Sequence, residues 1–583
     1  MMKVFRPYIR MIIALARIAL LATVVATAGA QITLKPIETD PIKIDSGLVS
    51  GTYLASGVKA YLGVPFAAPP IRENRWREPQ PMKTWQGVWT ANINRAECVQ
   101  GLRSNNINHY FGDEDAAEDC LYLNMWLPAN AKLGRKLPVM VWIYGGAFSG
   151  GSASMAVYSG ENTAKKGVIY VAPNYRVGIF GFLAHPEATK ESGHNASGNW
   201  GLMDQVAALK WVQRNIASFG GDPGNVTILG QSAGSMSIND LQASPLAKGL
   251  FHRAIGMSGS TLGGALTSST LAEAEDQGLK LQAAMKVNSL AEMRTFSSDK
   301  VMAAAQANQL RFSPAVDGYF LPKSPAEIFK AGQQNDVPIL VGCTANDMGT
   351  TPLIRRATTV AEYRDAAAKM YAAKAAEFLE LYPVSNDTEV KAQADTVGRE
   401  SGLSANPRKW AKAHAETGKA PAYLFMFSRV HPYTPGVVFP DHNPATVGAY
   451  HMGDVPYWLM TLDSFNLFRT TRDWTPYDRD LANKMSDVIV SFAKTGNPST
   501  AAVKMVKYDP SNEQLVDFGD LIKVTKLNTK GMNFIEATPA IQQPGAGRGR
   551  QGGAPSPVGP PPSRTFCPGP GVSQSEARRA GSE

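Results

Sequence analysis

Ser232 lies in the pattern G-Q-S-A-G, between Gly230 and Gly234 and directly after the apolar residues 226–229. A serine hydroxyl attacks a carbonyl carbon once a base removes its proton, and a sharp turn from strand to helix presents the hydroxyl to that base. Glycine two positions to either side leaves room for such a turn. The pattern indicates nucleophilic catalysis, although the glycine and serine content of the chain would produce roughly 0.3 chance matches.

A second glycine-rich segment, residues 144–148 (YGGAF), follows another apolar run. A tetrahedral intermediate carries an oxyanion that needs backbone N–H donors, and small residues let the main chain come close to it. In this interpretation the donors are the amides of Gly146, Ala147 and Ala233, the last of which is beside the serine. The alternative is an ordinary glycine turn, and the segment alone favours neither.

The elements that would position these residues are buried strands with helices between them. Five apolar runs are too continuous for strands with one exposed face; they are residues 138–144, 168–173, 226–229, 338–341 and 423–427. Helical stretches such as residues 201–218 fall between several of them. This alternation predicts an α/β fold with a mostly parallel sheet, helices on both faces, and a ligand site outside the carboxyl ends of the strands. Ser232 follows one such end.

The start of the chain predicts a secretory signal over residues 1–30. Basic residues at positions 3, 6 and 10 precede the apolar residues 11–26, and the small residues 28–30 (AGA) form a cleavage site. The alternative, a retained membrane anchor, is disfavoured because Arg17 interrupts the apolar run. We therefore expect an exported protein, periplasmic or secreted, with no stable membrane anchor after cleavage.

The rest of the chain predicts one body and one tail. Residues 31–540 show no internal repeat or linker and predict a single large domain, whereas residues 541–583 are rich in Gly, Pro, Gln and Arg and predict a disordered tail. The formal charge is +9, but four basic residues belong to the signal and the tail carries five arginines against two glutamates. The body is thus nearly neutral, and nothing favours a nucleic-acid partner.

The four cysteines favour one disulfide and no metal site. Cys98 and Cys120 are separated by 21 residues rich in Asn, Asp and Gly, so they can close a surface loop in an oxidising compartment. Cys343 lies in an apolar run and predicts a buried thiol, while Cys567 belongs to the tail. No two cysteines have the C-x-x-C spacing of a metal site.

Further segments carry a resemblance to known proteins, in one order over most of residues 45–500. They are GVPFAAPP (63–70), EDCLYLNMW (118–126), WIYGGAF (142–148), NYRVGIFGFL (174–183), NWGLMDQVAALKWVQRNIASFGGDP (199–223), GQSAGS (230–235) and GAYHMGDVPY (448–457). With these segments the chain resembles a type B carboxylesterase of the carboxylesterase/cholinesterase/lipase family, within the α/β hydrolases.

The resemblance implies an α/β-hydrolase fold with insertions around an active-site gorge. It also implies a catalytic triad in the order Ser, acid, His, an oxyanion hole in the GGAF loop, and a disulfide between Cys98 and Cys120. Two structural ion pairs follow from it as well, Arg75 with Glu118 and Arg176 with Asp204. No metal or organic cofactor is implied.

The general base must follow the acid, and four histidines qualify: His414, His431, His442 and His451. Only His451 stands in the family's G-A-x-H context. Without the resemblance, His442 would rank nearly equal. We therefore predict that His451 takes the proton from Ser232 and returns it to the leaving alcohol.

The acid departs from the family pattern, in which a short loop after a strand carries Asp-Glu-Gly. Here the segment is VGCTANDMG (341–349), one residue longer between its glycines. Counting forward from Gly342 places Asp347 at the acid position, whereas counting back from Gly349 places Met348 there. The strand fixes the start of the loop, and a thioether cannot stabilise an imidazolium, so Asp347 is the predicted acid. The alternative is a solvated turn aspartate and an incomplete triad.

The predicted function is a serine carboxylic-ester hydrolase that acts through an acyl-enzyme on small to medium esters, aromatic ones included. Choline esters are disfavoured, because the loop from Cys98 to Cys120 lacks the tryptophan that the family's cholinesterases place there. Four aromatic residues are candidates for a gorge lining and equally for the core: Phe148, Trp200, Tyr450 and Trp458. The alternatives are an amidase or lactonase on the same triad, and a catalytically weak, neuroligin-type binding protein. The oligomeric state is left open.

Overall fold

The computed structural model describes residues 35–101, 115–263, 268–347, 352–402, 405–538 and 540–541. By internal contacts the chain divides into Met1–Ala540 and Ile541–Glu583, and all the described helices and strands belong to the first unit. The predicted signal, nearly all of the predicted tail and the alternative acid position Met348 lie outside the described residues.

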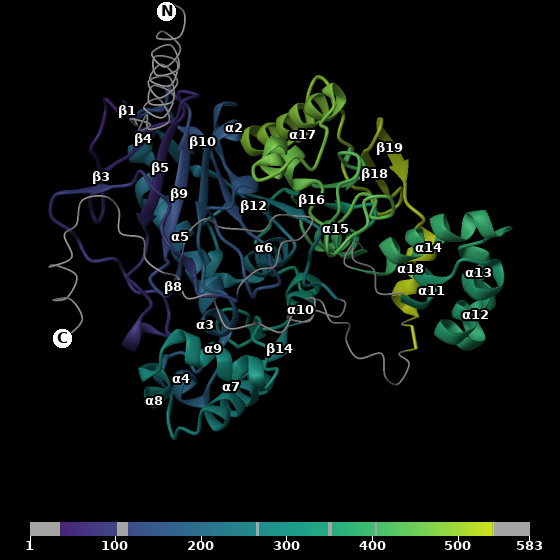
Figure 1. Cartoon of the computed structure of the whole chain (residues 1–583), viewed down its shortest axis with the longest axis horizontal. Helices are drawn as coiled ribbons and strands as arrows, with labels where there is room; N and C mark the ends of the chain where they lie inside the picture. Colours follow the sequence, from purple (N-terminus) through teal and green to yellow (C-terminus); the bar gives the residue numbers. More distant parts are fainter. Residues whose placement is uncertain are drawn as a thin grey trace, which may run out of the picture. The chain divides into compact units, whose positions relative to one another are not determined.

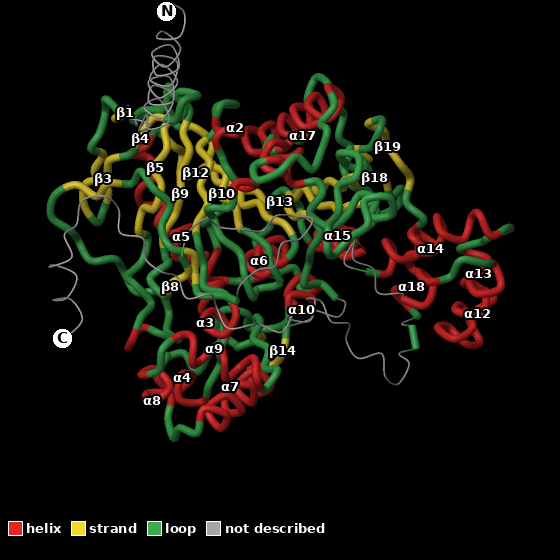
Figure 2. Tube along the Cα trace, viewed as in Figure 1, coloured by secondary structure: helices red, strands yellow, loops and turns green. Residues whose placement is uncertain are grey.

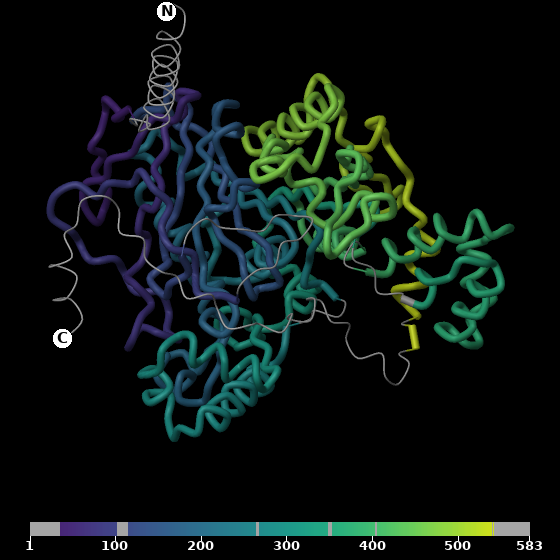
Figure 3. Tube along the Cα trace, in the orientation of Figure 1, coloured from purple at the N-terminus to yellow at the C-terminus, as the bar shows by residue number. Residues whose placement is uncertain are grey.

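A large sheet forms the centre of this unit. Its strands, in spatial order, are β1 (Lys35–Pro36), β4 (Thr52–Tyr53), β5 (Lys59–Pro65), β9 (Tyr122–Leu127), β11 (Ile169–Pro173), β10 (Leu137–Ile143), β12 (Gly221–Gln231), β13 (Arg253–Met257), β16 (Ile339–Thr344), β17 (Ala422–Phe427), β18 (Gln514–Phe518) and β19 (Ile522–Lys526). The strands from β11 to β18 run parallel to one another, and the strands at both edges pair antiparallel. Figure 3 shows the N-terminal strands at one edge and the C-terminal strands at the other.

Three smaller sheets lie outside the large one. They are formed by β2 (Ile42–Ile44), β3 (Gly47–Ser50) and β6 (Val88–Thr90), by β7 (Glu97–Cys98) and β8 (Ala116–Ala117), and by β14 (Ser269–Thr270) and β15 (Ala315–Val316).

All five predicted strands exist, and they are five of the seven described strands that run parallel in the large sheet, since β13 and β18 were not predicted. Continuous burial explains why they could be recognised: every residue of β11 and β16 is buried. The strand before Ser232 is longer than its apolar run, because it begins at Gly221 and ends at Gln231. The pattern missed β13, whose sequence RAIGM is too short and mixed to stand out.

Helices pack against the parallel strands and cover the sheet (Figure 2). Those in contact with it include α5 (Trp200–Asn215), α6 (Ala233–Ala243), α15 (Asn406–Thr417) and α17 (Pro476–Thr495). The predicted helix over residues 201–218 is α5 followed by the short helix η3 (Ile216–Phe219), and it ends where Gly220 adopts a φ of 88°. The left-handed conformation favours glycine at that position.

The remaining α-helices lie in the connections between strands or after the last strand (Figure 1). They are α2 (Glu161–Ala164), α3 (Gly178–Phe182), α4 (Pro186–Glu191), α7 (Leu271–Met285), α8 (Leu290–Thr295), α9 (Ser298–Ala307), α10 (Pro325–Lys330) and α16 (Val455–Trp458), and a separate group made of α11 (Pro352–Arg356), α12 (Val360–Tyr371), α13 (Ala375–Leu381), α14 (Asp387–Ser401) and α18 (Thr529–Ala537). That separate group buries a hydrophobic cluster of its own, with Tyr363, Phe378 and Tyr382 fully buried. Among the described residues, no helix has both the length and the apolar character needed to span a membrane.

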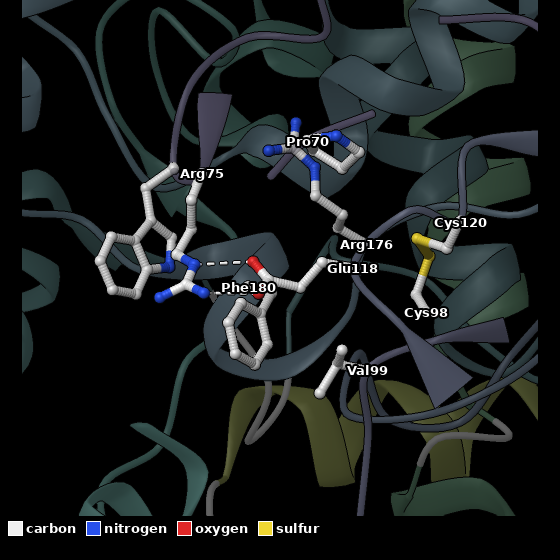
Figure 4. A pocket seen from close by; sticks show the side chains of 9 residues that line it. Pro70, Arg75, Cys98, Val99, Glu118, Cys120, Arg176 and Phe180 are labelled. Carbon is white, nitrogen blue, oxygen red and sulfur yellow. Dashed lines mark hydrogen bonds and ion pairs between the residues drawn. A yellow bond between two sulfur atoms is a disulfide. The ribbon is translucent and has the colours of Figure 1, made fainter. Parts of the chain in front are cut away.

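The cross-links that the resemblance implied are all formed. A disulfide joins Cys98 to Cys120. The guanidinium of Arg75 donates to Glu118 at 2.6 Å (Figure 4). It also donates to the carbonyl of Phe296 at 2.8 Å. These contacts tie the segment before the disulfide loop to an insertion more than two hundred residues away.

The second implied ion pair lies in the core. Arg176 donates from Nε and Nη2 to the two carboxylate oxygens of Asp204, each at 2.8 Å, and both side chains are buried. A cavity of about 10 Å³ lies between the two ion pairs and the disulfide (Figure 4). That volume holds about one water molecule, so this region supports the fold rather than a ligand.

Candidate active site

Ser232 occupies a strained turn between β12 and α6. Its backbone adopts φ 58° and ψ −124°, a conformation that costs a side-chain-bearing residue about 1–3 kcal/mol. Its N–H donates to the carbonyl of Met257 on the neighbouring strand at 2.8 Å, and its carbonyl accepts from the N–H of Met236 at 3.0 Å. The turn is thus held from both sides, and the side chain remains partly exposed.

The flanking glycines are required by close packing against the neighbouring strand β10. A Cβ atom on Gly234 would lie 2.0 Å from the carbonyl oxygen of Ile143, and one on Gly230 would lie 2.4 Å from the same oxygen. Since real Cβ atoms do not come so close, any other residue at position 230 would push β12 away from β10, and one at position 234 would push α6 away from it. The two glycines of the G-x-S-x-G pattern therefore allow the serine turn to pack directly against β10.

The GGAF loop leaves the sheet beside this turn, because the strand register pairs Ile143 with Gly230. Gly146, Ala147 and Phe148 have φ values of 120°, 55° and 58°. Within the described residues, the loop and cap hydrogen bonds do not use the N–H groups of Gly146, Ala147 or Ala233. Ala233 is also the first residue of α6, where the helix dipole favours negative charge. Ala233 directly follows Ser232, and the GGAF loop starts from the strand beside it, so these amides stay predicted donors of an oxyanion hole.

Asp347 and His451 are in direct contact. His451 Nδ1 lies 2.6 Å from Asp347 Oδ1, and the carboxylate is fully buried whereas 17% of the imidazole side chain is exposed. Asp347 follows the carboxyl end of β16, the same edge of the sheet at which β12 delivers Ser232. The structure thus places Asp347 against a base, and the solvated-turn alternative does not describe it.

The electrostatic surroundings keep the imidazole basic. Burial lowers the pKa of His451, but the carboxylate of Asp347 acts in the opposite direction and Asp454 adds to it, so the net pKa is raised. Asp454 is itself buried, and desolvation raises its pKa to about 6. The imidazolium that forms when a base accepts a proton is therefore stabilised at this position.

The other three candidate bases do not reach the site. His414 lies buried in α15 beside Gln242 and Asp336, and His442 pairs with the adjacent Asp441 at 2.8 Å on the surface. His431 is fully buried, and desolvation lowers its pKa to about 3. Its Nε2 donates to the carbonyl of Gly453 at 2.7 Å. His431 therefore stays neutral and holds the segment that follows His451.

The sequence analysis missed the residues that fix the loop of His451. The N–H of Asn346 donates to the carbonyl of Ala449 at 3.0 Å, and its side-chain oxygen accepts from the N–H of Ala449 at 2.9 Å. A Cβ atom on Gly448 would lie 2.2 Å from that same oxygen, so the loop needs glycine there. Asn346 directly precedes Asp347 in the sequence. This proximity to the predicted acid is the local feature that could have pointed to the role of Asn346.

A buried arginine holds the other side of the loop. Arg472 donates to the hydroxyl of Tyr450 at 3.0 Å, and its guanidinium lies 4.6–5.0 Å from the rings of Tyr433, Phe439 and Phe465. Such cation–π contacts help to offset the cost of burying the charge. The residue before His451 is thus fixed as firmly as the segment after it.

Two of the four aromatic candidates for a gorge lining are core residues. Trp200 donates to the carbonyl of Leu183 at 2.9 Å, and Trp458 donates to Asp454 at 3.1 Å and packs on Phe518. Tyr450 is held by Arg472, and Phe148 is 5% exposed and packs edge-on against Phe182. Among the described residues, no three His, Cys, Asp or Glu side chains form a group that could hold a metal ion.

Known proteins resemble this chain over most of its length. The model of the carboxylesterase family matches residues 38–535. The chain is 35% identical over 472 residues to a fumonisin B1 esterase of Sphingopyxis macrogoltabida, covering 79% of this chain and 84% of that protein. It is 34% identical to the para-nitrobenzyl esterase of Bacillus subtilis, with 81% and 93% of the two chains covered, and 32% identical to the human cocaine esterase, with 76% and 80% covered.

Solved structures agree with the sequence relatives. A structure of a PNB esterase superposes with a TM-score of 0.69 at 31% sequence identity, and the match covers 86% of this chain and 99% of that one. The predicted fold and the predicted class of enzyme are thereby confirmed. The chain belongs to the carboxylesterase family, has the α/β-hydrolase fold and is a carboxylic ester hydrolase.

Proposed function

We propose that Ser232, His451 and Asp347 are the catalytic triad of this esterase. We further propose that its substrates are small to medium esters, aromatic ones included. The observation that carries the proposal is the 2.6 Å contact between His451 Nδ1 and Asp347 Oδ1. It lies at the sheet edge where β12 ends in the strained serine turn. A nucleophile, a base and an orienting acid are the three parts that acyl transfer needs.

In the first half of the cycle, Ser232 Oγ attacks the ester carbonyl while His451 Nε2 takes the hydroxyl proton. The oxyanion of the tetrahedral intermediate accepts hydrogen bonds from the amides of Gly146, Ala147 and Ala233. The imidazolium then gives its proton to the leaving alcohol, and the acyl group stays on the serine. Asp347 stabilises the imidazolium and fixes its tautomer.

In the second half, water attacks the acyl-enzyme and His451 acts as its base. The same amides hold the second oxyanion, and the serine leaves with the proton that His451 returns. The names of three relatives refer to para-nitrobenzyl, cocaine and fumonisin B1 esterases, so the chemistry that they share is ester cleavage rather than one particular alcohol.

We also propose that residues 1–30 are removed during export and that the mature protein is periplasmic or secreted. The Cys98–Cys120 disulfide supports this location, since disulfides persist in oxidising compartments. Mass spectrometry of the exported protein should give an N-terminus directly after Ala30. An intact N-terminus in the membrane fraction would instead indicate a retained anchor.

Replacement of Ser232 by alanine tests the function. The purified protein should hydrolyse a series of p-nitrophenyl esters of increasing acyl length, and Ser232→Ala should lower that activity by at least about 10⁴-fold with an unchanged melting temperature. An organophosphate should label the wild-type protein once, at Ser232. Rates on matched amide and lactone substrates show whether the protein is an amidase or a lactonase instead. If the organophosphate does not label the protein stoichiometrically, the protein is a binding protein and not a hydrolase.

Replacement of Asp347 by asparagine tests the acid. The expected result is a fall in kcat of order 10⁴, because an amide in this place favours the wrong tautomer of His451. Asp441→Asn, at the carboxylate that pairs with His442, is the matched control and should change kcat by less than about twofold. If Asp347→Asn lowers kcat only a few-fold, another carboxylate orients the base.

The pH profile tests the raised pKa of His451. The ring accepts a proton only when it is neutral, so activity is present above its pKa and is lost as the pH falls through it. Because the pKa is raised from the ordinary value of 6.5, the acidic limb of kcat/KM should lie above pH 6.5. The profile is measured with one neutral p-nitrophenyl ester, and a limb at or below pH 6.5 would contradict the assignment.

A further inference from the structure

Gln231 is the last residue of β12, directly before Ser232, and its side chain contacts His451. The residue is fully buried, and its Nε2 lies 3.1 Å from Nε2 of His451. This is the ring nitrogen that has to accept the proton of Ser232. Within the described residues, the imidazole has two hydrogen-bond partners, Asp347 on one nitrogen and Gln231 on the other.

The other end of the carboxamide has no partner. Oε1 of Gln231 is buried and accepts no hydrogen bond from any residue that the structure describes. Buried polar atoms of folded proteins are nearly always paired, so an unpaired oxygen beside a catalytic base calls for an explanation. A carboxamide presents a donor and an acceptor on one planar group, and a half-turn about its last bond exchanges them.

The two ends match the two protonation states of His451. In the resting enzyme the neutral ring donates from Nδ1 to Asp347, and its Nε2 lone pair accepts from the Gln231 amide. This second hydrogen bond breaks when the Ser232 hydroxyl gives its proton to Nε2. Once the proton of Ser232 Oγ has moved to Nε2, the ring presents an N–H there, and it requires an acceptor. A half-turn of the carboxamide brings Oε1 to that N–H, and Oε1 loses no hydrogen bond in the process.

Gly145 leaves space for this exchange. A Cβ atom at position 145 would lie 3.1 Å from Gln231 Oε1 and 2.5 Å from its carbonyl oxygen. Any larger residue would crowd the carboxamide against the sheet.

We propose that Gln231 is a positioning residue that partners His451 in both protonation states. It donates to the neutral ring and accepts from the imidazolium during each half of the cycle. Gln231 neither gains nor loses a proton, because the proton travels from Ser232 to His451 and then to the leaving alcohol. The inference rests on the proposed role of His451 as the base.

Two near-isosteric variants test the proposal in opposite directions. Gln231→Met keeps the length of the side chain and removes both polar ends, so the imidazolium loses its acceptor. The plateau kcat should then fall about tenfold. KM should stay within about twofold of the wild-type value, and the acidic limb of the pH profile should move by less than about 0.3 pH units. Gln231→Glu keeps an acceptor, so the plateau kcat should stay within about threefold of the wild type.

The acidic limb of Gln231→Glu should move upward by about one pH unit, because a further carboxylate favours the imidazolium. The carboxylates that already raise the pKa of this ring are Asp347 and Asp454. The midpoint of the acidic limb is therefore an apparent pKa of the whole group of interacting residues. If Gln231 has only a structural role, we expect the plateau kcat of the two variants in the reverse order. The apolar methionine would then be tolerated, and the buried charge would be damaging.

Gln205→Met is the matched control. Gln205 is also buried, donates through Nε2 to Ser237 at 3.1 Å and has an unpaired Oε1, but it lies in α5 away from the base. It should leave the plateau and the limb unchanged. Organophosphate titration gives the concentration of active sites in every variant. Because kcat is calculated from this concentration, a misfolded fraction does not lower it.

The results distinguish an error in the role of Gln231 from an error in the role of His451. A wild-type plateau in Gln231→Met, or an equal loss of plateau in both variants, would overturn the role of Gln231. His451→Gln is measured alongside. If it retains activity, the proposed base is wrong, whereas an inactive His451→Gln with a fully active Gln231→Met refutes the role of Gln231 alone.

Discussion

The strained backbone of Ser232 is the constraint on which the rest of the structure depends. A residue with a side chain adopts φ 58° and ψ −124° only when its surroundings leave no alternative. Those surroundings are the hydrogen bond to Met257, the first turn of α6, and two glycines pressed against the carbonyl of Ile143. The central parallel strands can be regarded as the frame that keeps this one turn from relaxing.

The base is positioned by a different strategy. His451 lies between β17 and α16, in a long connection with little regular structure, so no strand fixes it directly. Buried polar groups do so instead: Asn346 holds the residues before it, Arg472 holds Tyr450, and His431 holds Gly453. Ser232 is therefore positioned by a strained backbone and His451 by hydrogen bonds, and the partners that hold both residues lie at the carboxyl edge of the sheet.

Local sequence signals predicted the parts of the structure that local forces determine. The buried strands were recognisable from continuous apolar runs, and the serine turn from its glycines. Counting from the end of strand β16 predicted Asp347 as the acid despite one extra residue in its loop, and this residue does contact His451. Asn346, Gln231 and Arg472 could not be predicted, because their partners lie 22 to 220 residues away and an isolated polar residue gives no sign of such a contact. Strand β13 was missed because five residues with an arginine and a glycine carry too little pattern.

The separate hydrophobic cluster of α11, α12, α13, α14 and α18 has a consequence for how the enzyme can change. These helices bury Tyr363, Phe378 and Tyr382 among themselves. Most of them are inserted between β16 and β17, directly after the loop of Asp347. Because the insertion has its own core, substitutions can repack it without altering the register of the two strands. The chain thus separates the sheet that carries the proposed triad from a helical module that begins five residues after Asp347.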